Sequence, residues 1–282
     1  MSNSSSLTRR APARSLASQF LCGAYSLTPS RSPATAVPAT SCPEPAPLPT
    51  LGEAVTASAE REPQEELRAL PALTDLPREL LLELALGSAQ RRVQTGAVLV
   101  EQSTLQPSLV VLVRGAVKVV RTTTHATGES TVLLEVARAP ALLPGTSFFD
   151  GLPEAASVVA LRASHVLSLD RRTVLRMQGQ QPAFARALMA HLTQSVRRHV
   201  RRIDEVASGP VGERVRHLLE GLARDHGTPF GQGRFIAIPL RRRDIACMVN
   251  ATTETVSRVL ARFEREGLTR STRDGIWFRC RT

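Results

Sequence analysis

The carboxyl-terminal third of the chain carries two short stretches in which apolar positions recur at helical spacing. Within 240–267, apolar residues repeat every three or four positions, first over 245–249 and then over 256–263, which predicts two amphipathic helices. Asn250-Ala251-Thr252 separates them. Asn tolerates the left-handed backbone of a sharp turn. The Thr252 hydroxyl can accept a hydrogen bond from a backbone N–H that has no partner within the second helix. This pattern predicts a helix-turn-helix.

The flanking residues extend the motif. Leu268–Arg270 and Ile276–Phe278 predict two strands around Asp274-Gly275, a strong hairpin signal. A strand at Phe235–Ile238 and an amphipathic helix at Val211–His226 precede the motif. Together these elements predict a winged helix-turn-helix.

The middle of the chain changes to short runs rich in Val and Leu, divided by turn-forming Gly and Pro. These runs predict strands over 97–101, 109–114, 116–121, 131–136, 157–161 and 166–169. Regular short strands of this kind favour an antiparallel barrel or jelly roll. A short helix over 77–86 precedes them, and helical character begins near Glu65. The predicted fold class is therefore α+β.

The stretch 180–206 has apolar residues every three or four positions with arginines between them, which predicts one long helix. Its apolar stripe includes Leu188, Leu192, Val196, Val200 and Ile203. A single stripe on a long helix needs a partner. That partner is either the helix's own roll or the same helix of a second copy of the chain.

These patterns divide the chain into four parts: a leader (1–65), the roll (66–178), the long helix with its hinge (179–207) and the winged helix-turn-helix (208–282). The first fifty residues hold eight Pro and ten Ser. Such a composition buries too little apolar surface to offset the entropy of ordering, so we expect a disordered leader, or a start codon assigned too far upstream. An export signal is the alternative, but polar residues interrupt its apolar run.

The charge balance is strongly basic. The net charge is +11, from 36 basic and 25 acidic residues, which favours an anionic partner such as nucleic acid. Residues 238–282 alone hold ten Arg and five acidic residues, so the excess falls on the helix-turn-helix. No stretch of eighteen apolar residues predicts a membrane span. We therefore expect a cytoplasmic protein with no membrane partner.

Cysteine usage and known catalytic motifs argue against several other classes. The four cysteines, Cys22, Cys42, Cys247 and Cys280, form no CxxC pair, and a disulfide framework is not expected in a chain of this size. We expect Cys247 to pack and Cys280 to be exposed; redox sensing by these thiols stays an alternative. The sequence has no P-loop, GxSxG or HExxH motif, so no enzyme is predicted.

The outward face of the second motif helix carries polar side chains suited to base edges. They are Thr253, Glu254, Ser257 and Arg258. Arg matches the two acceptors of guanine, Glu accepts from the amino group of cytosine, and Ser bonds to either kind of edge. These residues are predicted to read bases in double-stranded DNA. The alternative is a surface helix whose charges only face water.

A second set of residues is suited to the phosphate backbone, which gives position and affinity rather than sequence choice. The set is Arg241, Arg242, Arg243, Thr252 and Arg273. The three consecutive arginines stand at the start of the first motif helix, and Arg273 stands at the predicted wing tip. We expect all five to contact DNA phosphates.

The segment Glu254–Arg258, read Glu-Thr-Val-Ser-Arg, resembles the recognition signature of the Crp/Fnr family of bacterial transcription factors. Its Glu-x-x-Ser-Arg form is similar to that of the oxygen-sensing branch, whose half-sites resemble TTGAT. The run LVVLVRGAVKVV at 109–120 resembles the family's effector domain. The resemblance covers about 75–282. It implies a cyclic-nucleotide-binding-like β-roll and a homodimer on a TTGAT-N4-ATCAA-like palindrome.

The chain departs from the family in ways that bear on its ligand. Nucleotide-binding members carry a Gly-Glu pair and an Arg-Ser or Arg-Thr pair in the loop that corresponds to 144–159, where this chain has Gly145 but no Arg. Asp150 and Glu154 would repel a phosphate, and a buried phosphodiester without Arg is costly. His199-Val200 replaces the hydroxyl pair that touches the base. We therefore expect no gating by cyclic AMP.

Other cofactors of the family are not expected either. An iron–sulfur cluster needs four cysteines near the sensor domain, and only Cys22 and Cys42 precede the roll. Haem needs a placed His or Cys ligand. His125 falls in a predicted strand-connecting loop and His165 near a predicted strand start, and histidines at such positions are usually solvated or packed. No cofactor and no metal are predicted.

At the start of the first motif helix, Arg241 stands where relatives have a Ser or Thr that caps the helix. Arg has no hydroxyl, so it cannot cap the helix in that way.

The resemblance also implies partners. The family uses the long helix as its dimer seam, and reading a palindrome requires a two-fold axis. A loop at 227–233 lies where relatives contact RNA polymerase, which makes the polymerase a candidate partner. The remaining alternatives are a ligand-gated regulator, a non-specific nucleic-acid-binding protein, and a protein-interaction module built on the winged helix.

Overall fold

The structure is a computed structural model that describes residues 62–280 apart from 127, 144 and 208, with side chains left out at 205–207. All of these residues belong to one compact unit, Ala46–Thr282. The predicted leader lies outside the described residues as far as 61. The predicted boundary at 65 falls within α1, which spans Pro63–Arg68.

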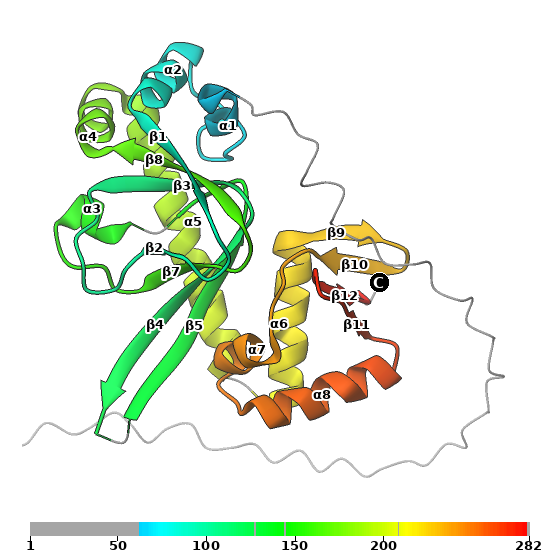
Figure 1. Cartoon of the computed structure of the whole chain (residues 1–282). Coiled ribbons are helices and arrows are strands. Elements are labelled where there is room, and N and C mark those ends of the chain that lie inside the picture. Colours follow the sequence, from blue (N-terminus) through cyan, green and yellow to red (C-terminus); the bar gives the residue numbers. More distant parts are fainter. Residues whose placement is uncertain (1–61, 127, 144, 208, 281–282) are drawn as a thin grey trace, which may run out of the picture. The chain divides into compact units, whose positions relative to one another are not determined.

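Two four-stranded antiparallel sheets form the predicted roll (Figure 1). One sheet has the strand order β1-β8-β3-β6 and the other β2-β7-β4-β5. Their bounds are β1 Ser88–Val93, β2 Val98–Val100, β3 Ser108–Arg114, β4 Ala116–His125, β5 Gly128–Arg138, β6 Ala141–Leu142, β7 Ser157–Ala160 and β8 Ser164–Asp170. The α+β class and all six predicted strands are confirmed, within a few residues at their ends.

The two sheets of the roll pack face to face through alternating apolar side chains. The cluster between them includes Leu112 from β3, Val117 from β4, Val158 from β7 and Val166 from β8, each fully buried. Strand β1 was not predicted, because Ser88–Val93 lacks a run of Val and Leu and its residues 89–92 are exposed. It joins the sheet at an edge, through antiparallel pairing with β8 alone.

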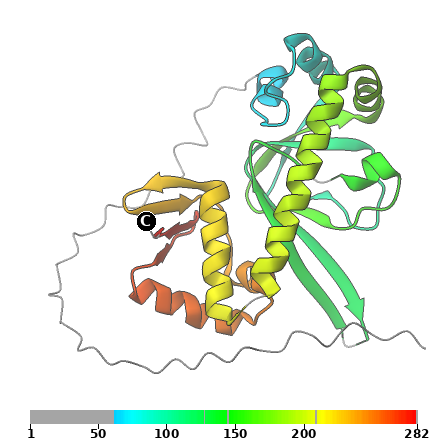
Figure 2. The same cartoon turned by 180° about the vertical axis from the view of Figure 1, so that it is seen from behind.

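Short helices and one long helix surround the roll. They are α2 Arg78–Leu86, α3 Thr146–Asp150, α4 Arg171–Gln180 and α5 Pro182–Ala207. The prediction of one helix over 180–206 is wrong at its start, because Gln180 ends α4 and the extended Gln181 separates it from α5. Figure 2 shows α5 running along the roll.

The apolar stripe of α5 divides into a buried part and an exposed part. Leu188 is only 5 % exposed and packs with Phe184 in the cluster formed by α1, α2, α4 and the β3/β8 face. Leu188 therefore lies in the core of its own roll and not on an exposed seam. The later members are open: Leu192 is 41 %, Val196 60 %, Val200 54 % and Ile203 65 % exposed.

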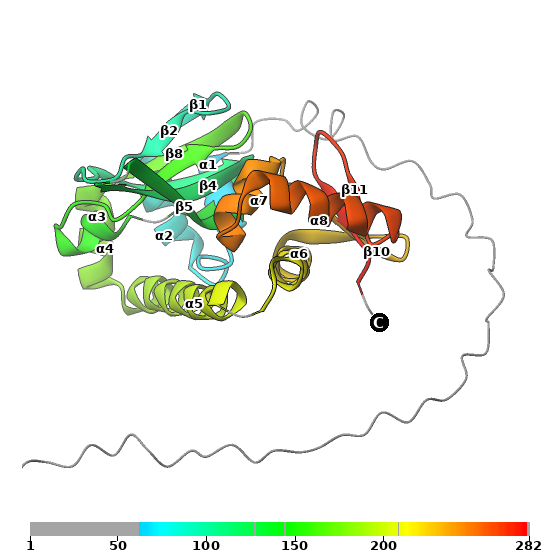
Figure 3. The same ribbon diagram turned by 90° about the horizontal axis from the view of Figure 1, so that it is seen from below.

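The carboxyl-terminal part is a winged helix-turn-helix, as predicted (Figure 3). Its elements are α6 Val211–His226, β9 Gly227–Phe230, β10 Gly233–Ile236, α7 Arg242–Val249, α8 Thr253–Arg265, β11 Thr269–Ser271 and β12 Ile276–Phe278. The four strands form one sheet in the order β11-β12-β10-β9. The predicted loop at 227–233 is wrong, because most of it forms a β9–β10 hairpin.

The core of this part reaches into the roll. Buried residues of α6, α7 and α8 share one cluster with Ala116 of β4 and with Leu133 and Val136 of β5. Glu135 lies between these two β5 residues, where a bulge interrupts the pairing with β4. Helix α7 therefore packs directly against the outer surface of β5.

Candidate nucleic-acid interface

The turn between α7 and α8 has the predicted geometry. Asn250 has φ 48° and ψ 60°, in the left-handed region that a short polar side chain tolerates. The Thr252 hydroxyl oxygen accepts a hydrogen bond from the Thr255 backbone N–H at 3.2 Å, which caps α8. Val256, Leu260 and Phe263 face the core, at most 5 % exposed. The turn and the core thus hold α8 with its opposite face outward.

The outward face of α8 carries the predicted base-reading side chains. The side chains of Glu254 and Arg258 are 80 % and 71 % exposed, with Arg258 Nη2 lying 3.7 Å from Glu254 Oε1. An exposed ion pair of this kind contributes little and exchanges readily for other partners. Ser257 donates its hydroxyl to the Thr253 carbonyl at 2.8 Å, so its oxygen remains an acceptor. Thr253 is exposed in the first turn.

The predicted phosphate contacts are all exposed to solvent. Arg241, Arg242 and Arg243 stand in a row at the start of α7. Arg273 lies in the turn between β11 and β12, and Thr252 stands at the start of α8. The structure thus places these residues at three separate points of the same winged domain.

Asp244 caps α7 in place of a hydroxyl at residue 241. Its carboxylate accepts the Arg241 backbone N–H at 2.9 Å, whereas a guanidinium has no acceptor to offer. The side chain of Asp244 is only 4 % exposed, and it also forms an ion pair with Lys118 of β4.

Two arginines that look solvent-facing in the sequence hold the end of α7. Arg214 of α6 donates from Nε to the Val249 carbonyl at 3.0 Å and from Nη2 to the Asn250 carbonyl at 3.3 Å. Arg202 of α5 donates to the Met248 carbonyl at 2.6 Å. Positive side chains at a helix C-terminus satisfy its orphan carbonyls. The sequence gives no sign of these bonds, because their partners are 35 and 46 residues away.

The loop at 145–159 is organised by a carboxylate of its own. Glu154 is 4 % exposed. One of its oxygens accepts the Ser147 backbone N–H at 3.1 Å and the Ser147 hydroxyl at 2.7 Å, and the other accepts the Thr146 hydroxyl at 3.1 Å. The Glu154 carboxylate is therefore the negatively charged group that accepts the hydrogen bonds at the start of α3.

Two arginines from outside this loop reach it. Arg121 of β4 donates to the Ala155 carbonyl and Arg171 of α4 donates to the Phe148 carbonyl, both at 3.1 Å. Both arginines stand outside 144–159, so the sequence of the loop alone does not predict them. Each guanidinium bonds a backbone carbonyl, which fastens the loop to the roll.

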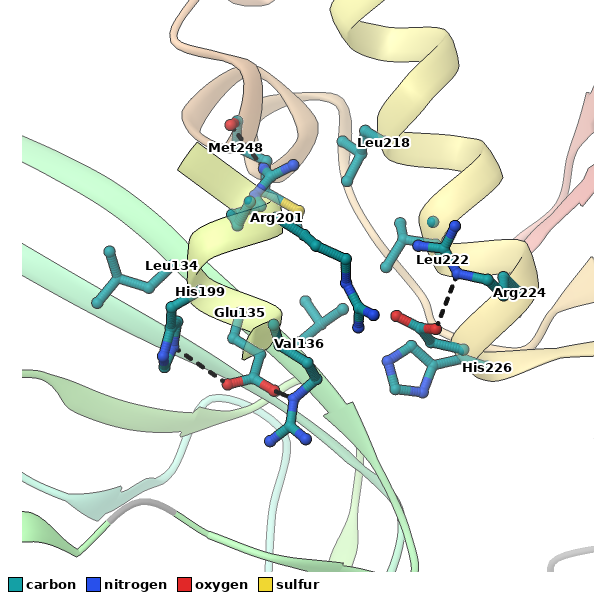
Figure 4. A pocket seen from close by; sticks show the side chains of 14 residues that line it. Leu134, Glu135, Val136, His199, Arg201, Leu218, Leu222, Arg224, His226 and Met248 are labelled. Carbon is teal, nitrogen blue, oxygen red and sulfur yellow. Dashed lines mark hydrogen bonds and ion pairs between the residues drawn. The ribbon is translucent and has the colours of Figure 1, made fainter. Parts of the chain in front are cut away.

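His199, which replaces a hydroxyl in the family pattern, lies beside Glu135. Its Nε2 is 3.5 Å from one Glu135 oxygen, and Arg198 Nε is 2.9 Å from the other (Figure 4). Burial alone would raise the pKa of Glu135, but the hydrogen bond with His199 and the charge of Arg198 outweigh burial and lower that pKa. The same hydrogen bond raises the pKa of His199 above its ordinary value.

The structure shows the surroundings of two cysteines and the length and polarity of the described helices. Cys247 packs against the winged-domain core as predicted. Cys280 was expected to be exposed, but it is half-buried against the same core. No helix among the described residues is long and apolar enough to cross a membrane.

Comparison with known proteins agrees with this architecture. Residues 213–279 match the model of a Crp-like helix-turn-helix domain, and residues 90–181 match that of a cyclic nucleotide-binding domain. The two matches account separately for the winged domain and for the roll. The class of protein is therefore a DNA-binding transcriptional regulator with a cyclic-nucleotide-binding-type roll.

Individual relatives are similar to this chain over different shares of their length. The chain is 29% identical over 191 residues to the cyclic AMP receptor protein of Thermus thermophilus, covering 67% of this chain and 83% of that protein. It is 28% identical over 121 residues to a CRP-like cAMP-activated global transcriptional regulator of Mycobacterium tuberculosis, covering 43% and 54%. The structure of FixK2 from Bradyrhizobium japonicum has a TM-score of 0.59 at 19% identity, covering 69% of this chain and 93% of that one. The chain belongs to the Crp/Fnr family of transcriptional regulators.

Proposed function

We propose that this regulator binds as a homodimer to an inverted repeat of the TTGAT-N4-ATCAA type. The observation that carries the proposal is the exposed pair Glu254 and Arg258 at the start of α8, 80 % and 71 % exposed, on a helix held by a capped turn. The N-terminal residues of a recognition helix are those that meet base edges in the major groove.

Each polar residue of the interface has a proposed role. Arg258 contacts guanine through its two-donor fork, and Glu254, Ser257 and Thr253 contact neighbouring bases. The phosphate contacts come from Arg241, Arg242, Arg243, Thr252 and Arg273. Contacts of this second kind are expected to raise affinity for all DNA and to set its salt dependence.

The proposed dimer seam is the exposed part of the α5 stripe. Leu192, Val196, Val200 and Ile203 are 41–65 % exposed on one helix, and Met189 joins them at 65 %. A row of exposed apolar side chains on a long helix is typical of a helix that pairs with another. Leu188 is excluded from the seam, because the roll already buries it.

We propose that cyclic AMP does not gate this protein, although the names of two relatives refer to it. A phosphate near α3 would meet the Glu154 carboxylate, which already accepts three hydrogen bonds there. Two anions in one buried place repel each other. The alternative, a regulator gated by cyclic AMP, predicts saturable binding of cyclic AMP to the purified chain, which calorimetry measures directly. RNA polymerase is the proposed protein partner of the DNA-bound dimer.

Selection from random DNA with the purified protein tests the proposed site. We expect enrichment of TTGAT-like inverted repeats, and each base-pair change in a half-site should cost about 1–3 kcal/mol of binding free energy. Arg258→Ala should lose discrimination at the guanine. Arg265→Ala is the matched control, because Arg265 is an exposed arginine in the last turn of the same helix.

The outcomes separate the proposal from its alternatives. Equal affinity for scrambled sites would indicate a non-specific nucleic-acid-binding protein. Protein binding that ignores added DNA would indicate an interaction module. Retained sequence preference in Arg258→Ala would contradict the assignment of that residue.

A further inference from the structure

A small cavity lies among β5, α5, α6 and the end of α7 (Figure 4), and no residue of α8 lines it. Its volume is about 70 Å³, which is room for roughly five water molecules. The lining comes from Glu135 and its neighbours on β5, from α5 (residues 198, 199, 201 and 202), from α6 (residues 218, 221, 222 and 224–226) and from Met248. The cavity is thus bounded by elements of both the roll and the winged domain.

The lining is rich in positive charge. It contains the four guanidiniums of Arg198, Arg201, Arg202 and Arg224, against the two carboxylates of Glu135 and Asp225. His199 also lines the cavity, and its hydrogen bond to Glu135 raises its pKa. The four guanidiniums outnumber the two carboxylates, and an excess of one sign of charge on a concave surface raises the local concentration of the opposite ion. The charge balance therefore favours an anion.

The arginines differ in what they already bond. Arg198 pairs with Glu135 at 2.9 Å and Arg224 pairs with Asp225 at 3.3 Å. Arg202 donates to the carbonyl of Met248 at 2.6 Å. Figure 4 shows Arg201 reaching from α5 toward α6, where Arg224 and His226 lie. Both helices thus present guanidiniums to the cavity.

The floor of the cavity is apolar, which strengthens polar interactions above it. Leu134 and Val136 come from β5, and Leu218 and Leu222 come from α6. Val136, Leu218 and Leu222 are at most 7 % exposed. Poorly hydrated surroundings increase the strength of a charge-assisted hydrogen bond.

We propose that this cavity binds a small, doubly charged oxyanion of the size of inorganic phosphate, held by Arg201 and Arg224. Guanidinium groups match the tetrahedral oxygens of such an ion with paired donors. The volume excludes a nucleotide, whose sites in proteins are several times larger. The ion would bridge α5 to α6 and so stabilise the docking of the winged domain on the roll.

Binding of inorganic phosphate to the full-length protein, measured by calorimetry and by thermal unfolding, tests the proposal. We expect saturable binding and a melting temperature that rises with phosphate, because a ligand that binds only the folded state stabilises it. Sodium chloride at the same ionic strength should not reproduce the rise. Arg201→Gln and, independently, Arg224→Gln should each weaken binding roughly tenfold.

Two control variants keep the test specific. Arg197→Gln removes a neighbouring exposed arginine of α5 that does not line the cavity, and it should bind phosphate as the wild type does. Arg258→Ala removes a basic group of the proposed DNA surface and should also retain phosphate binding. Unchanged affinity in both cavity variants, or loss in Arg258→Ala instead, would overturn the proposal. The result does not depend on DNA sequence preference, so it is separable from the proposed function.

Discussion

The Nζ atom of Lys118 lies 2.6 Å from a carboxylate oxygen of Asp244. The two residues are 126 positions apart, Lys118 on β4 of the roll and Asp244 in the first turn of α7. Their side chains are 17 % and 4 % exposed. The other Asp244 oxygen accepts the Arg241 N–H at 2.9 Å. The Asp244 carboxylate therefore caps the first helix of the helix-turn-helix and also forms an ion pair that links this helix to the roll.

Replacement of Lys118 by Met keeps most of the side-chain length and removes the charge. The Asp244 carboxylate would stay buried without its cation, so we expect a loss of about 2–3 kcal/mol in the free energy of unfolding. This figure is at the low end for a buried pair, because Lys118 is partly exposed. Urea unfolding followed by circular dichroism measures the loss.

A double-mutant cycle supplies the control for Lys118→Met. Asp244→Asn should also destabilise the protein, and the double variant should lose less than the sum of the two single losses. Additive losses would show that the two residues act independently, and the proposed fastening would then be wrong.

Glu154 gives a second prediction, on the loop at 145–159. Glu154→Gln replaces a buried anion that accepts three hydrogen bonds by a neutral group that has only one acceptor oxygen. We expect a loss of about 2 kcal/mol of stability, measured by urea unfolding. Asp150→Asn, an exposed acid of the same loop, is the matched control and should change stability by less than about 0.5 kcal/mol. Equal losses in the two variants would contradict the role given to Glu154.

The local features of the interface were predictable from the sequence because their causes are local. Asn250 adopts the left-handed turn and Thr252 caps the next helix, and both depend on neighbours within three residues. The buried face of α8 follows from apolar spacing alone. The exposed face of α8 is the face opposite these apolar residues. The exposure of Glu254 and Arg258 could therefore be predicted from the sequence.

Long-range features were not predictable in the same way. Leu188 and Leu192 have the same spacing signal, yet the roll buries one and leaves the other 41 % exposed. Arg214 looks like one more surface arginine, but it holds two carbonyls near the end of α7. In each case the partner is far along the chain, and periodicity carries no information about it. Strand β1 was missed because an exposed polar edge strand lacks an alternating pattern.

The exposed α5 stripe gives a third prediction. Val196→Glu would place a carboxylate of each subunit in the proposed seam, so we expect dimerisation to weaken by at least roughly tenfold. Sedimentation velocity at micromolar concentration measures the change. Gln194→Glu adds the same charge at an exposed polar position of the helix and should leave the dimer intact.

Leu188→Ala distinguishes the seam from the core. Because Leu188 is buried inside its own roll, the substitution should cost about 2–4 kcal/mol of stability and leave the dimerisation constant unchanged. A wild-type dimerisation constant in Val196→Glu, or dissociation caused by Leu188→Ala, would show that the seam lies elsewhere.

The Glu135–His199 pair gives a prediction for the pH dependence of stability. The hydrogen bond to Glu135 raises the pKa of His199 above its ordinary 6.5, so the contribution of His199 is complete below pH 6.5 and is lost as pH rises through the raised value. Burial opposes ionisation of Glu135, but His199 and Arg198 lower its pKa below 4.5. The contribution of Glu135 is therefore complete above pH 4.5 and is lost as pH falls through the lowered value.

The stability difference between the wild type and His199→Gln should accordingly be greatest between pH 4.5 and 6.5 and decline on both sides. His199 is about half exposed, so the difference should stay below about 1 kcal/mol. His226 provides a comparison of opposite sign, because desolvation lowers its pKa. Because His226 is half-buried and its neutral form is favoured in the folded state, the wild type should lose stability as pH falls below 6.5, and His226→Gln should remove that slope. Urea unfolding of the three proteins from pH 4 to 9 measures these slopes, and a flat difference for His199→Gln would contradict the assigned ion pair.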